Sequence, residues 1–370
     1  MKQGWEIKKL GEVCSITMGQ SPSSDTYNDS EGLPFFQGNA DFGKIHPSIR
    51  VYCNAPIRIA DVDDILISVR APIGAINIAD CKCCIGRGLA SIRNNAEVAN
   101  EYIYHALIAN KEKLIAQGTG STFKSIGKEA LKELSIPVPP WEEQERIVEE
   151  LDCLSGVIEK KREQLKQLDA LAQSIFYQMF GDPITNEKGF PVYKIDDIIT
   201  FQGGSQPDKS HFEYEPTDDN IRLIQIRDYK SDKNITYIPK SLARRLCNAE
   251  DIMIGRYGPP IFQILKGIEG AYNVALMKAI PKQGNREFIR AFLKQKCLLE
   301  YLESMSKRTA GQDGIQMDKL KAYPFPLPPI ELQDEFADKI EAIEKQKELI
   351  KKSISETETL FNARMDYYFN

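Results

Sequence analysis

The sequence contains few histidines, and its cysteines are not arranged in a metal-binding pattern. Only three histidines occur, and none stands at the spacing expected of metal ligands. Eight cysteines are present, but the cluster of Cys81, Cys83 and Cys84 lacks the paired C-x-x-C halves of a structural zinc site. We therefore expect reduced thiols that hold no metal, as is usual in the reducing cytosol.

Long apolar runs are also missing. The stretch PIRIADVDDILISV at residues 56–69 is broken by charge well before the roughly 20 residues needed to cross a bilayer. The first residues, MKQGWEIKKLGEV, lack the apolar centre of a signal peptide. The stretch GTGSTFKS at residues 118–125 imitates a phosphate loop but has Phe123 in place of the second glycine, so it does not predict nucleotide binding. These features predict a cytoplasmic protein.

Length and composition predict more than one folding unit. The chain has 370 residues, which exceeds the usual size of one compact core. Its hydrophobic content of 42% and charged content of 27% are ordinary for a globular protein. Neither value suggests disorder, so we expect each unit to bury a core of its own.

The chain repeats itself internally. The phrase IPVPPWEEQERI at residues 136–147 returns as FPLPPIELQDEF at residues 325–336, with an offset of 189. Three earlier pairs match at similar offsets: KKLGEVCSITMGQSP with YKIDDIITFQGGSQP at 185, DDILISVRAPIG with EDIMIGRYGPPI at 187, and GSTFKSI with GQDGIQM at 191. Between these anchors the two copies diverge. A repeated frame around different content is therefore predicted.

Each copy of the phrase is followed by a heptad pattern. The first series is Ile147, Leu151, Leu154, Ile158, Leu165, Leu168, Ala172, Ile175 and Met179, and the second is Phe336, Ile340, Ile343, Ile350, Ile354 and Phe361. Lys161 interrupts the first series, and Lys347 and Thr357 interrupt the second. Steps of three and four residues predict two long helices with an apolar seam. Acidic residues crowd the first turn of both helices, where they favour helix initiation.

The seam has two interpretations. The 38 residues from 142 to 179 would form a helix of roughly 57 Å at about 1.5 Å per residue. Such a helix could pack only on its own domain, but a seam of this length normally needs a second helix along its whole run. We expect the other long helix to be that partner, with the seam lysines favouring one register. The sequence alone does not give the pairing direction.

The predicted order of parts follows from these observations. It is a globular unit at 1–140, a long helix at 141–180, a linker at 181–191, a second globular unit at 192–329 and a second long helix at 330–370. Residues 142–179 hold nine acids and five bases, and residues 331–370 hold ten acids and six bases. The remainder of the chain is consequently mildly basic, which is compatible with a polyanionic partner.

In combination, these residues resemble a known family. IPVPPWEEQERI opening a long helix, SIFYQMFGDP closing it and LFNARMDYYF near residue 370 are similar to the specificity subunit of type I restriction-modification enzymes. The resemblance covers essentially the whole chain. Leu332, where the first copy has Glu143, is a minor departure. The resemblance implies an α+β fold of two mixed α/β target recognition domains in tandem, separated and spaced by two long helices that form an antiparallel coiled coil.

The resemblance also implies a function. Each target recognition domain would read one half of a split asymmetric double-stranded DNA site, and the helices would set the distance between the halves. Two methyltransferase subunits would flip out and methylate an adenine, and motor-nuclease subunits would complete the restriction complex. S-adenosylmethionine, ATP and magnesium would belong to those partners. This chain would hold no cofactor.

Motifs of those enzymatic activities are missing from the sequence. It has no Asn-Pro-Pro-aromatic methylation motif, no complete phosphate loop and no Pro-Asp followed by a spaced Glu-x-Lys nuclease core. We therefore predict a non-catalytic subunit. The alternative from another class is a coiled-coil scaffold that binds protein partners rather than DNA.

Three sets of polar residues are candidates for DNA contacts. The first is Arg70 with Arg256 and its neighbour Tyr257, near the ends of matched strand-like segments, where arginine suits a guanine edge. The second contains amides, which suit adenine edges, and the third is a polar loop in each copy, which suits phosphate. The second set is Gln37, Asn39, Gln225 and Arg227, and the third is Thr119, Ser121, Thr122, Lys124, Lys307, Arg308 and Gln312. Each set has an ordinary alternative, namely a surface or phosphate-contacting arginine, a packed tyrosine, a turn-forming amide or a structural turn.

Overall fold

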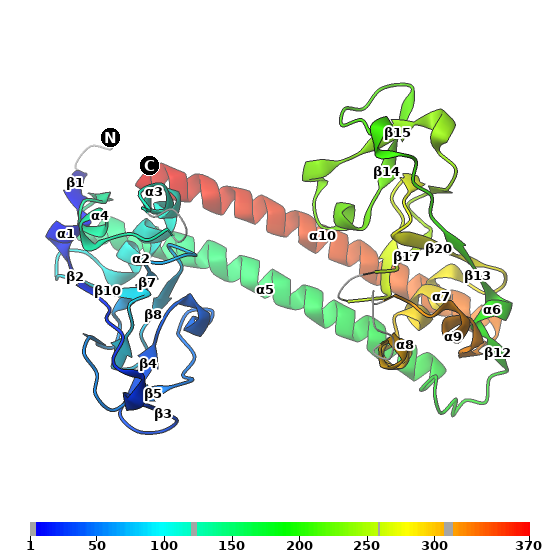
Figure 1. Cartoon of the computed structure of the whole chain (residues 1–370), viewed down its shortest axis with the longest axis horizontal. Coiled ribbons are helices and arrows are strands. Elements are labelled where there is room, and N and C mark those ends of the chain that lie inside the picture. Colours follow the sequence, from blue (N-terminus) through cyan, green and yellow to red (C-terminus); the bar gives the residue numbers. More distant parts are fainter. Residues whose placement is uncertain (1–4, 120–123, 258–259, 307–313) are drawn as a thin grey trace. The chain divides into compact units, whose positions relative to one another are not determined.

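The computed structural model describes residues 5–119, 124–257, 260–306 and 314–370. The chain divides into two compact units. Unit 1 comprises Met1–Glu163 and Lys351–Asn370, and unit 2 comprises Gln164–Ile350. Two long helices, α5 (Trp141–Phe180) and α10 (Ile330–Phe369), contribute to both units, as Figure 1 shows.

In its described residues, unit 1 combines three small sheets with short helices. The strand β1 (Glu6–Lys9) pairs antiparallel with β11 (Ser135–Val138). A second sheet has the order β2 (Cys14–Met18), β10 (Leu89–Asn94), β7 (Ile65–Ser68) and β8 (Ile76–Ile78). The third has the order β3 (Tyr27–Asn28), β5 (Tyr52–Cys53), β4 (Leu33–Phe36), β9 (Cys83–Ile85) and β6 (Ile59–Ala60). Its helices are α1 (Leu10–Val13), α2 (Asn100–Ala109), α3 (Lys111–Ala116) and α4 (Lys128–Lys132).

Unit 2 is built in the same way. The strand β12 (Val192–Lys194) pairs antiparallel with β21 (Pro324–Pro326). A second sheet has the order β13 (Ile199–Gly203), β20 (Leu276–Pro281), β17 (Ile252–Gly255) and β18 (Gln263–Lys266). The third has the order β15 (Tyr237–Pro239), β14 (Asn220–Ile224), β19 (Gly270–Tyr272) and β16 (Leu246–Cys247). Its short helices are α6 (Ile195–Ile198), α7 (Arg286–Leu293), α8 (Lys296–Ser306) and α9 (Met317–Ala322).

The internal repeat of the sequence is thus a repeat of topology. The order β2-β10-β7-β8 in unit 1 matches β13-β20-β17-β18 in unit 2. The third sheet of each unit contains one parallel pair, β4 with β9 and β14 with β19. The prediction of an α+β chain with two mixed domains in tandem and two long helices is confirmed.

The long helices run antiparallel within each unit. In unit 1, Glu150 accepts a hydrogen bond from Arg364, and Lys161 donates one to Ser353. In unit 2, the Lys347 ammonium lies 2.6 Å from the Asp169 carboxylate, and the Phe176 and Phe336 ring centroids are 5.8 Å apart. Residue numbers rise along α5 as they fall along α10 in both units. The pairing direction implied by the family resemblance is therefore present in each unit.

The predicted seam lies along this contact. Its twelve principal residues are all buried or half-buried: Ile147, Leu151, Leu154, Ile158, Leu165, Leu168, Phe336, Ile340, Ile343, Ile350, Ile354 and Phe361. Leucines outside the seam, such as Leu349 and Leu360, are exposed. The heptad pattern therefore identified the contact face of both helices.

The ends of the long helices belong to the cores of the globular parts. Met365, Tyr368 and Phe369 of α10 are buried with Tyr102 in the core of unit 1. Phe176 and Phe180 of α5 are buried in the core of unit 2, where they contact other aromatic rings. These aromatic residues lie outside the regular part of the seam, so the heptad count did not include them.

Other features bear on the exclusions made from sequence. Among the described residues, no helix is both long and apolar enough to cross a membrane. All eight cysteines are free thiols. In the part of the chain that the structure describes, no three histidine, cysteine, aspartate or glutamate side chains are grouped so as to hold a metal ion.

Candidate nucleic-acid interface

In unit 1, three segments that are far apart in sequence meet beside the end of β7. The Val69 N–H donates to the Gly88 carbonyl at 2.9 Å, and the Gly86 N–H donates to the Phe36 carbonyl at 2.8 Å. These bonds bring Arg70 and Gln37 to the turn between β9 and β10. The fold therefore places members of the first two candidate sets at one site.

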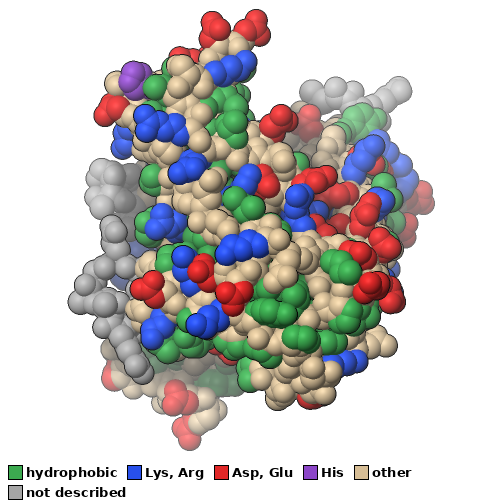
Figure 2. Space-filling model, turned by 90° about the vertical axis from the view of Figure 1, so that its right-hand side faces the viewer, with side chains coloured by type: hydrophobic (Ala, Val, Ile, Leu, Met, Phe, Trp, Pro, Cys, Tyr) green, Lys and Arg blue, Asp and Glu red, His purple; other side chains and the backbone are tan. Residues whose placement is uncertain are grey.

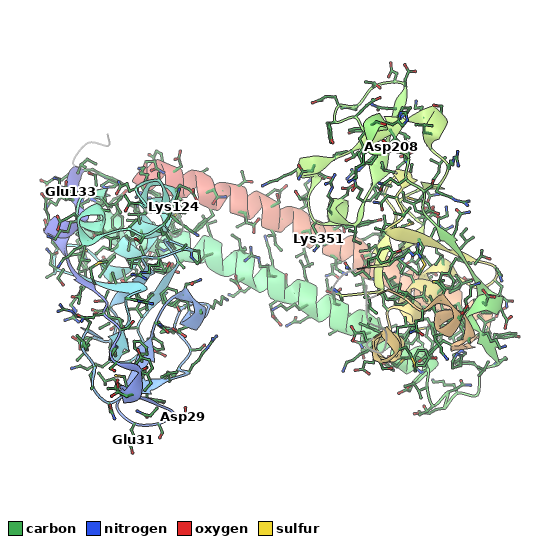
Figure 3. The ribbon with its side chains drawn as sticks, viewed as in Figure 1. Asp29, Glu31, Lys124, Glu133, Asp208 and Lys351 are labelled. Carbon is green, nitrogen blue, oxygen red and sulfur yellow. The ribbon has the colours of Figure 1, made fainter. Side chains whose placement is uncertain are left out.

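The third candidate set lies next to the first. Ser125 forms isolated antiparallel bridges with both Arg70 and Thr119. Lys124 precedes Ser125 in the chain, and its side chain is exposed, as are those of Gln37, Arg70 and Thr119. In Figure 3, Lys124 lies at the helical end of unit 1, whereas Asp29 and Glu31 lie at the opposite tip. The acidic tip is consequently remote from this lysine.

Asn39 differs from its neighbours in this group. It is half-buried and starts the 3-10 helix Asn39–Asp41. The Asp41 carboxylate accepts hydrogen bonds from the Gln37 and Gly38 N–H groups at 2.7 and 3.3 Å. This segment is a capped turn, which favours the turn-forming interpretation for Asn39 and leaves the Gln37 side chain exposed.

The sequence reasoning did not select Arg87, which stands at the centre of this site. Arg87 lies between Gly86 and Gly88 in the turn from β9 to β10, and its side chain is exposed. Its backbone N–H donates to Ser21 Oγ at 3.2 Å. Among the described residues, the side chains of Arg70, Arg87 and Lys124 have no acidic partner. An arginine between two glycines was the signal available in the sequence.

In unit 2, Arg256 and Tyr257 follow β17 directly. The Arg256 guanidinium donates to the Val274 carbonyl at 3.4 Å and lies 5.3 Å from the centre of the Tyr257 ring. Tyr257 is 42% exposed and bridges to Gly314. The tyrosine therefore both packs beside the arginine and presents an accessible ring.

The two arginines of the first set are not equivalent in the fold. In unit 1 the Val69 N–H donates a hydrogen bond to the Gly88 carbonyl in the β9–β10 turn. In unit 2 the Arg256 N–H donates one to the Ala275 carbonyl in the corresponding turn. Arg70 bridges to Ser125 as Tyr257 bridges to Gly314. Arg70 therefore corresponds to Tyr257, and Arg256 to Val69. Pairing the arginines by their nearness to a strand end misses this shift of one residue.

Gln225 and Arg227 of the second set are partly engaged within their own loop. Both side chains donate to Thr236 Oγ1, at 3.1 and 3.0 Å, and Thr236 is fully buried. Burial raises the pKa of the neighbouring Asp228 carboxyl, although a hydrogen bond from the Gln225 N–H and nearby arginines oppose this effect. These contacts hold the loop in place and favour a positioning role for the pair.

Five candidates, Ser121, Thr122, Lys307, Arg308 and Gln312, lie outside the described residues.

On the molecular face in Figure 2, lysine and arginine side chains are interspersed with aspartate and glutamate. No continuous basic stripe is visible on that face. Recognition of a polyanion there would depend on individual side chains more than on one large field.

Comparisons with known proteins agree with this architecture. The family model of the type I restriction modification DNA specificity domain matches residues 2–169 and 187–359. A Methanocaldococcus jannaschii protein assigned as the MjaX type I restriction enzyme specificity subunit is 45% identical over 177 residues, covering 47% of this chain and 42% of the relative. The EcoKI specificity subunit of Escherichia coli is 20% identical over 395 residues, covering 96% and 85%.

A solved structure shares the fold along the whole chain. The crystal structure of the type I restriction-modification system S subunit from M. genitalium matches with a TM-score of 0.60 at 15% identity, covering 100% of this chain and 98% of that one. The matches to the M. jannaschii MjaX and MjaIX subunits span 42% and 55% of those relatives. With two tandem matches that cover most of its length, this chain belongs to the type I restriction modification DNA specificity domain family.

Proposed function

We propose that this chain is the DNA-reading subunit of a type I restriction-modification complex. Each domain reads one half of a split asymmetric site, and the chain itself carries out no chemistry. The observation that carries the proposal is the repeated backbone frame with different exposed side chains. Arg70 in unit 1 corresponds to Tyr257 in unit 2, and Arg87 corresponds to Val274. Different side chains in one frame suit two different half-sites.

The proposal includes two methyltransferase subunits and, in the restriction form, motor-nuclease subunits as partners. S-adenosylmethionine, ATP and magnesium would be bound by those partners. Exposed apolar residues at equivalent positions support docking of one kind of protein twice. Ile7 and Val192 each lie opposite a proline in their strand pairs and are 52% and 55% exposed. Trp141 and Ile330 open the two long helices, and each is 46% exposed.

The same apolar positions favour the alternative function, a scaffold that binds only proteins. The two functions differ in their response to DNA. A DNA reader retains a specific duplex against excess random duplex, and its affinity falls as salt rises because phosphate counterions are released. A protein scaffold shows neither property.

The decisive experiment maps methylated adenines in a host that carries this chain and its methyltransferase partner. We expect methylation at a motif with two defined halves and an unspecified gap of fixed length. A host with the methyltransferase alone is the control and should lack this motif. Absence of new methylation with both subunits expressed, or a motif without a gap, would contradict the proposal.

A further inference from the structure

One turn occupies the same place in both units and differs in its central residue. In unit 1 the chain passes from β9 to β10 through Gly86, Arg87 and Gly88. The Gly86 N–H bonds to Phe36, and the Leu89 N–H closes the turn on the Gly86 carbonyl at 2.9 Å. In unit 2 the turn from β19 to β20 makes the same bonds: Asn273 N–H to the Ile224 carbonyl, and Leu276 N–H to the Asn273 carbonyl, each at 3.0 Å.

In each unit, a glycine just after a neighbouring strand donates a hydrogen bond to the residue that follows the turn. The Gly19 N–H donates to the Leu89 carbonyl at 2.9 Å, and the Gly204 N–H donates to the Leu276 carbonyl at 3.0 Å. A Cβ atom on Gly19 would lie 2.1 Å from the Gly86 carbonyl oxygen, and one on Gly204 would lie 2.0 Å from that of Asn273. Only glycine allows this approach, so the backbone of the turn is fixed in both units.

The central side chain of each turn is left exposed by this frame. In unit 1 it is Arg87, and the glycines on either side offer no side chain to shield it. In unit 2 it is Val274, an apolar residue that is 47% exposed. In unit 2 a positive charge reaches the same turn from a different segment, because Arg256, which follows β17, donates a hydrogen bond to the Val274 carbonyl. The two units therefore present different chemistry from one backbone position.

We infer that this central residue reads a base in each half-site. The inference rests on the proposed function and deepens it. Arg87 would bind a guanine edge through two parallel hydrogen bonds, since arginine matches the O6 and N7 acceptors of guanine in the major groove. Val274 offers no hydrogen bond, and its methyl groups suit the methyl group of thymine. The two domains would thus prefer different bases at equivalent positions.

The competing interpretation is a phosphate contact by Arg87. Most protein–DNA hydrogen bonds go to phosphate and sugar, and such contacts carry no sequence information. Arg87→Lys separates the two cases. Lysine keeps the charge that a phosphate needs but loses the planar fork that binds guanine bidentately. A base contact should suffer in this variant, and a phosphate contact should survive.

The test uses the complex of the full chain with its methyltransferase partner and selection from a randomised duplex DNA library. In Arg87→Ala and Arg87→Lys, we expect one position of one half-site to lose its guanine preference, with specific binding weakened roughly 5- to 150-fold. In Val274→Ala, one position of the other half-site should become less selective. Lys82→Ala, an exposed lysine of unit 1 beside Asp61, is the control and should leave the motif intact.

Several results would overturn the inference. One is uniform loss of binding to all sequences in Arg87→Ala together with normal binding in Arg87→Lys, which identifies a phosphate contact. Another is an unchanged motif in both Arg87 variants. A change in both half-sites would also contradict it. If the unmodified complex selects no two-part motif, the proposed function itself fails. This failure is distinguished from failure of the present inference because it is seen in the unmodified complex, before any variant is tested. Urea unfolding of each variant confirms that its fold is intact.

Discussion

Gln144 and Gln333 share two equivalent hydrogen bonds in the two units. Gln144 accepts from the Ala99 N–H at 2.9 Å and donates to the Pro139 carbonyl at 2.9 Å. Gln333 accepts from the Asn285 N–H at 2.8 Å and donates to the Pro328 carbonyl at 2.7 Å. Each glutamine is 1% exposed. The glutamine of the repeated phrase therefore ties the start of each long helix to the start of α2 or α7.

Replacing one glutamine should destabilise only its own unit. Gln144→Leu leaves a buried N–H and a buried carbonyl without partners, so we expect a loss of roughly 2 to 4 kcal/mol in the free energy of unfolding of unit 1. Both tryptophans, Trp5 and Trp141, belong to unit 1, so tryptophan fluorescence in urea follows that unit.

Gln333→Leu is the matched control for this measurement. It should leave the fluorescence transition unchanged and shift only the far-UV circular dichroism transition of unit 2. The stabilising role of these glutamine hydrogen bonds would be refuted if either variant unfolded like the unmodified chain. It would also be refuted if Gln333→Leu shifted the fluorescence transition to the same extent as Gln144→Leu.

The repeated phrase shows how far the sequence reasoning reached. Its prolines and acids predicted where the long helices start, and the steps of three and four residues predicted their contact face. Both properties depend on residues near one another in sequence. The role of Gln144 does not, because its partner Ala99 lies 45 residues away. No local pattern indicates which buried amide meets which backbone N–H.

The candidate interface shows the same limit. Arg70 and Gln37 were selected from sequence by residue type and position, whereas Arg87 was not. Arg87 is distinguished by its place in the fold, because three segments meet around its turn. Hydrogen bonds between residues distant in sequence join these segments. The one-residue shift between Arg70 and Arg256 is different, because the match at an offset of 187 already pairs Arg70 with Tyr257. Selecting arginines by their nearness to a strand end overlooked it.

Acid should weaken unit 1 partly through Glu150. Burial raises the pKa of this carboxyl, but hydrogen bonds from Tyr368 and Arg364 and the positive charges of Arg364 and Arg146 lower it by more, so the net shift is downward. Because the folded pKa is below the unfolded one, the stabilisation is present above the unfolded pKa and is lost as pH falls through the folded pKa.

Glu150→Gln should reveal this contribution in urea unfolding followed by fluorescence. We expect the variant to be less stable than the unmodified chain by about 1 kcal/mol near pH 7, with the difference shrinking towards about pH 4. Glu149→Gln, at an exposed neighbouring position, should change little at either pH. A difference for Glu150→Gln that grows on acidification would contradict the assignment.

Lys347 should contribute more to helix register than to stability. It is half-buried in the seam, with its ammonium 2.6 Å from Asp169 and 2.8 Å from Glu344. Asp169 is well exposed, and the Glu344 carboxylate still has the Lys266 ammonium at 3.7 Å. Neither acid is therefore left buried and unpaired when Lys347 is replaced. We expect Lys347→Met to change the stability of unit 2 by less than about 1 kcal/mol and Lys347→Glu to cost about 3 kcal/mol. Circular dichroism in urea compares the two, and equal losses would refute this account.

Arg256→Ala should affect one half-site only. Arg256 belongs to unit 2, and its guanidinium lies beside the Val274 turn and the Tyr257 ring. If it contacts a base, its loss should cost about 1 to 3 kcal/mol of discrimination at one position. Arg286→Ala, which removes a half-buried arginine paired with Glu250 in the same unit, is the control and should keep the motif. Mapping methylated adenines gives the result, and equal loss at both half-sites would contradict it.

The antiparallel register defines a matched deletion that tests whether the long helices set the gap of the recognised site. Glu150 meets Arg364 and Lys161 meets Ser353, so the same number of residues separates these contacts on both helices. Removing residues 154–160 from α5 and 354–360 from α10 takes one heptad from each helix and keeps both contacts in phase.

We expect the double deletion to shorten the unspecified gap of the methylated motif and leave its half-sites unchanged. One heptad is about 10 Å of helix, or about 3 base pairs of DNA. Deletion from α5 alone is the control. It cannot keep both contacts, so it should destabilise unit 1 and abolish site-specific methylation. An unchanged gap, or altered half-site sequences, in the double deletion would show that the helices do not measure the site, because the reading side chains in both globular parts are untouched.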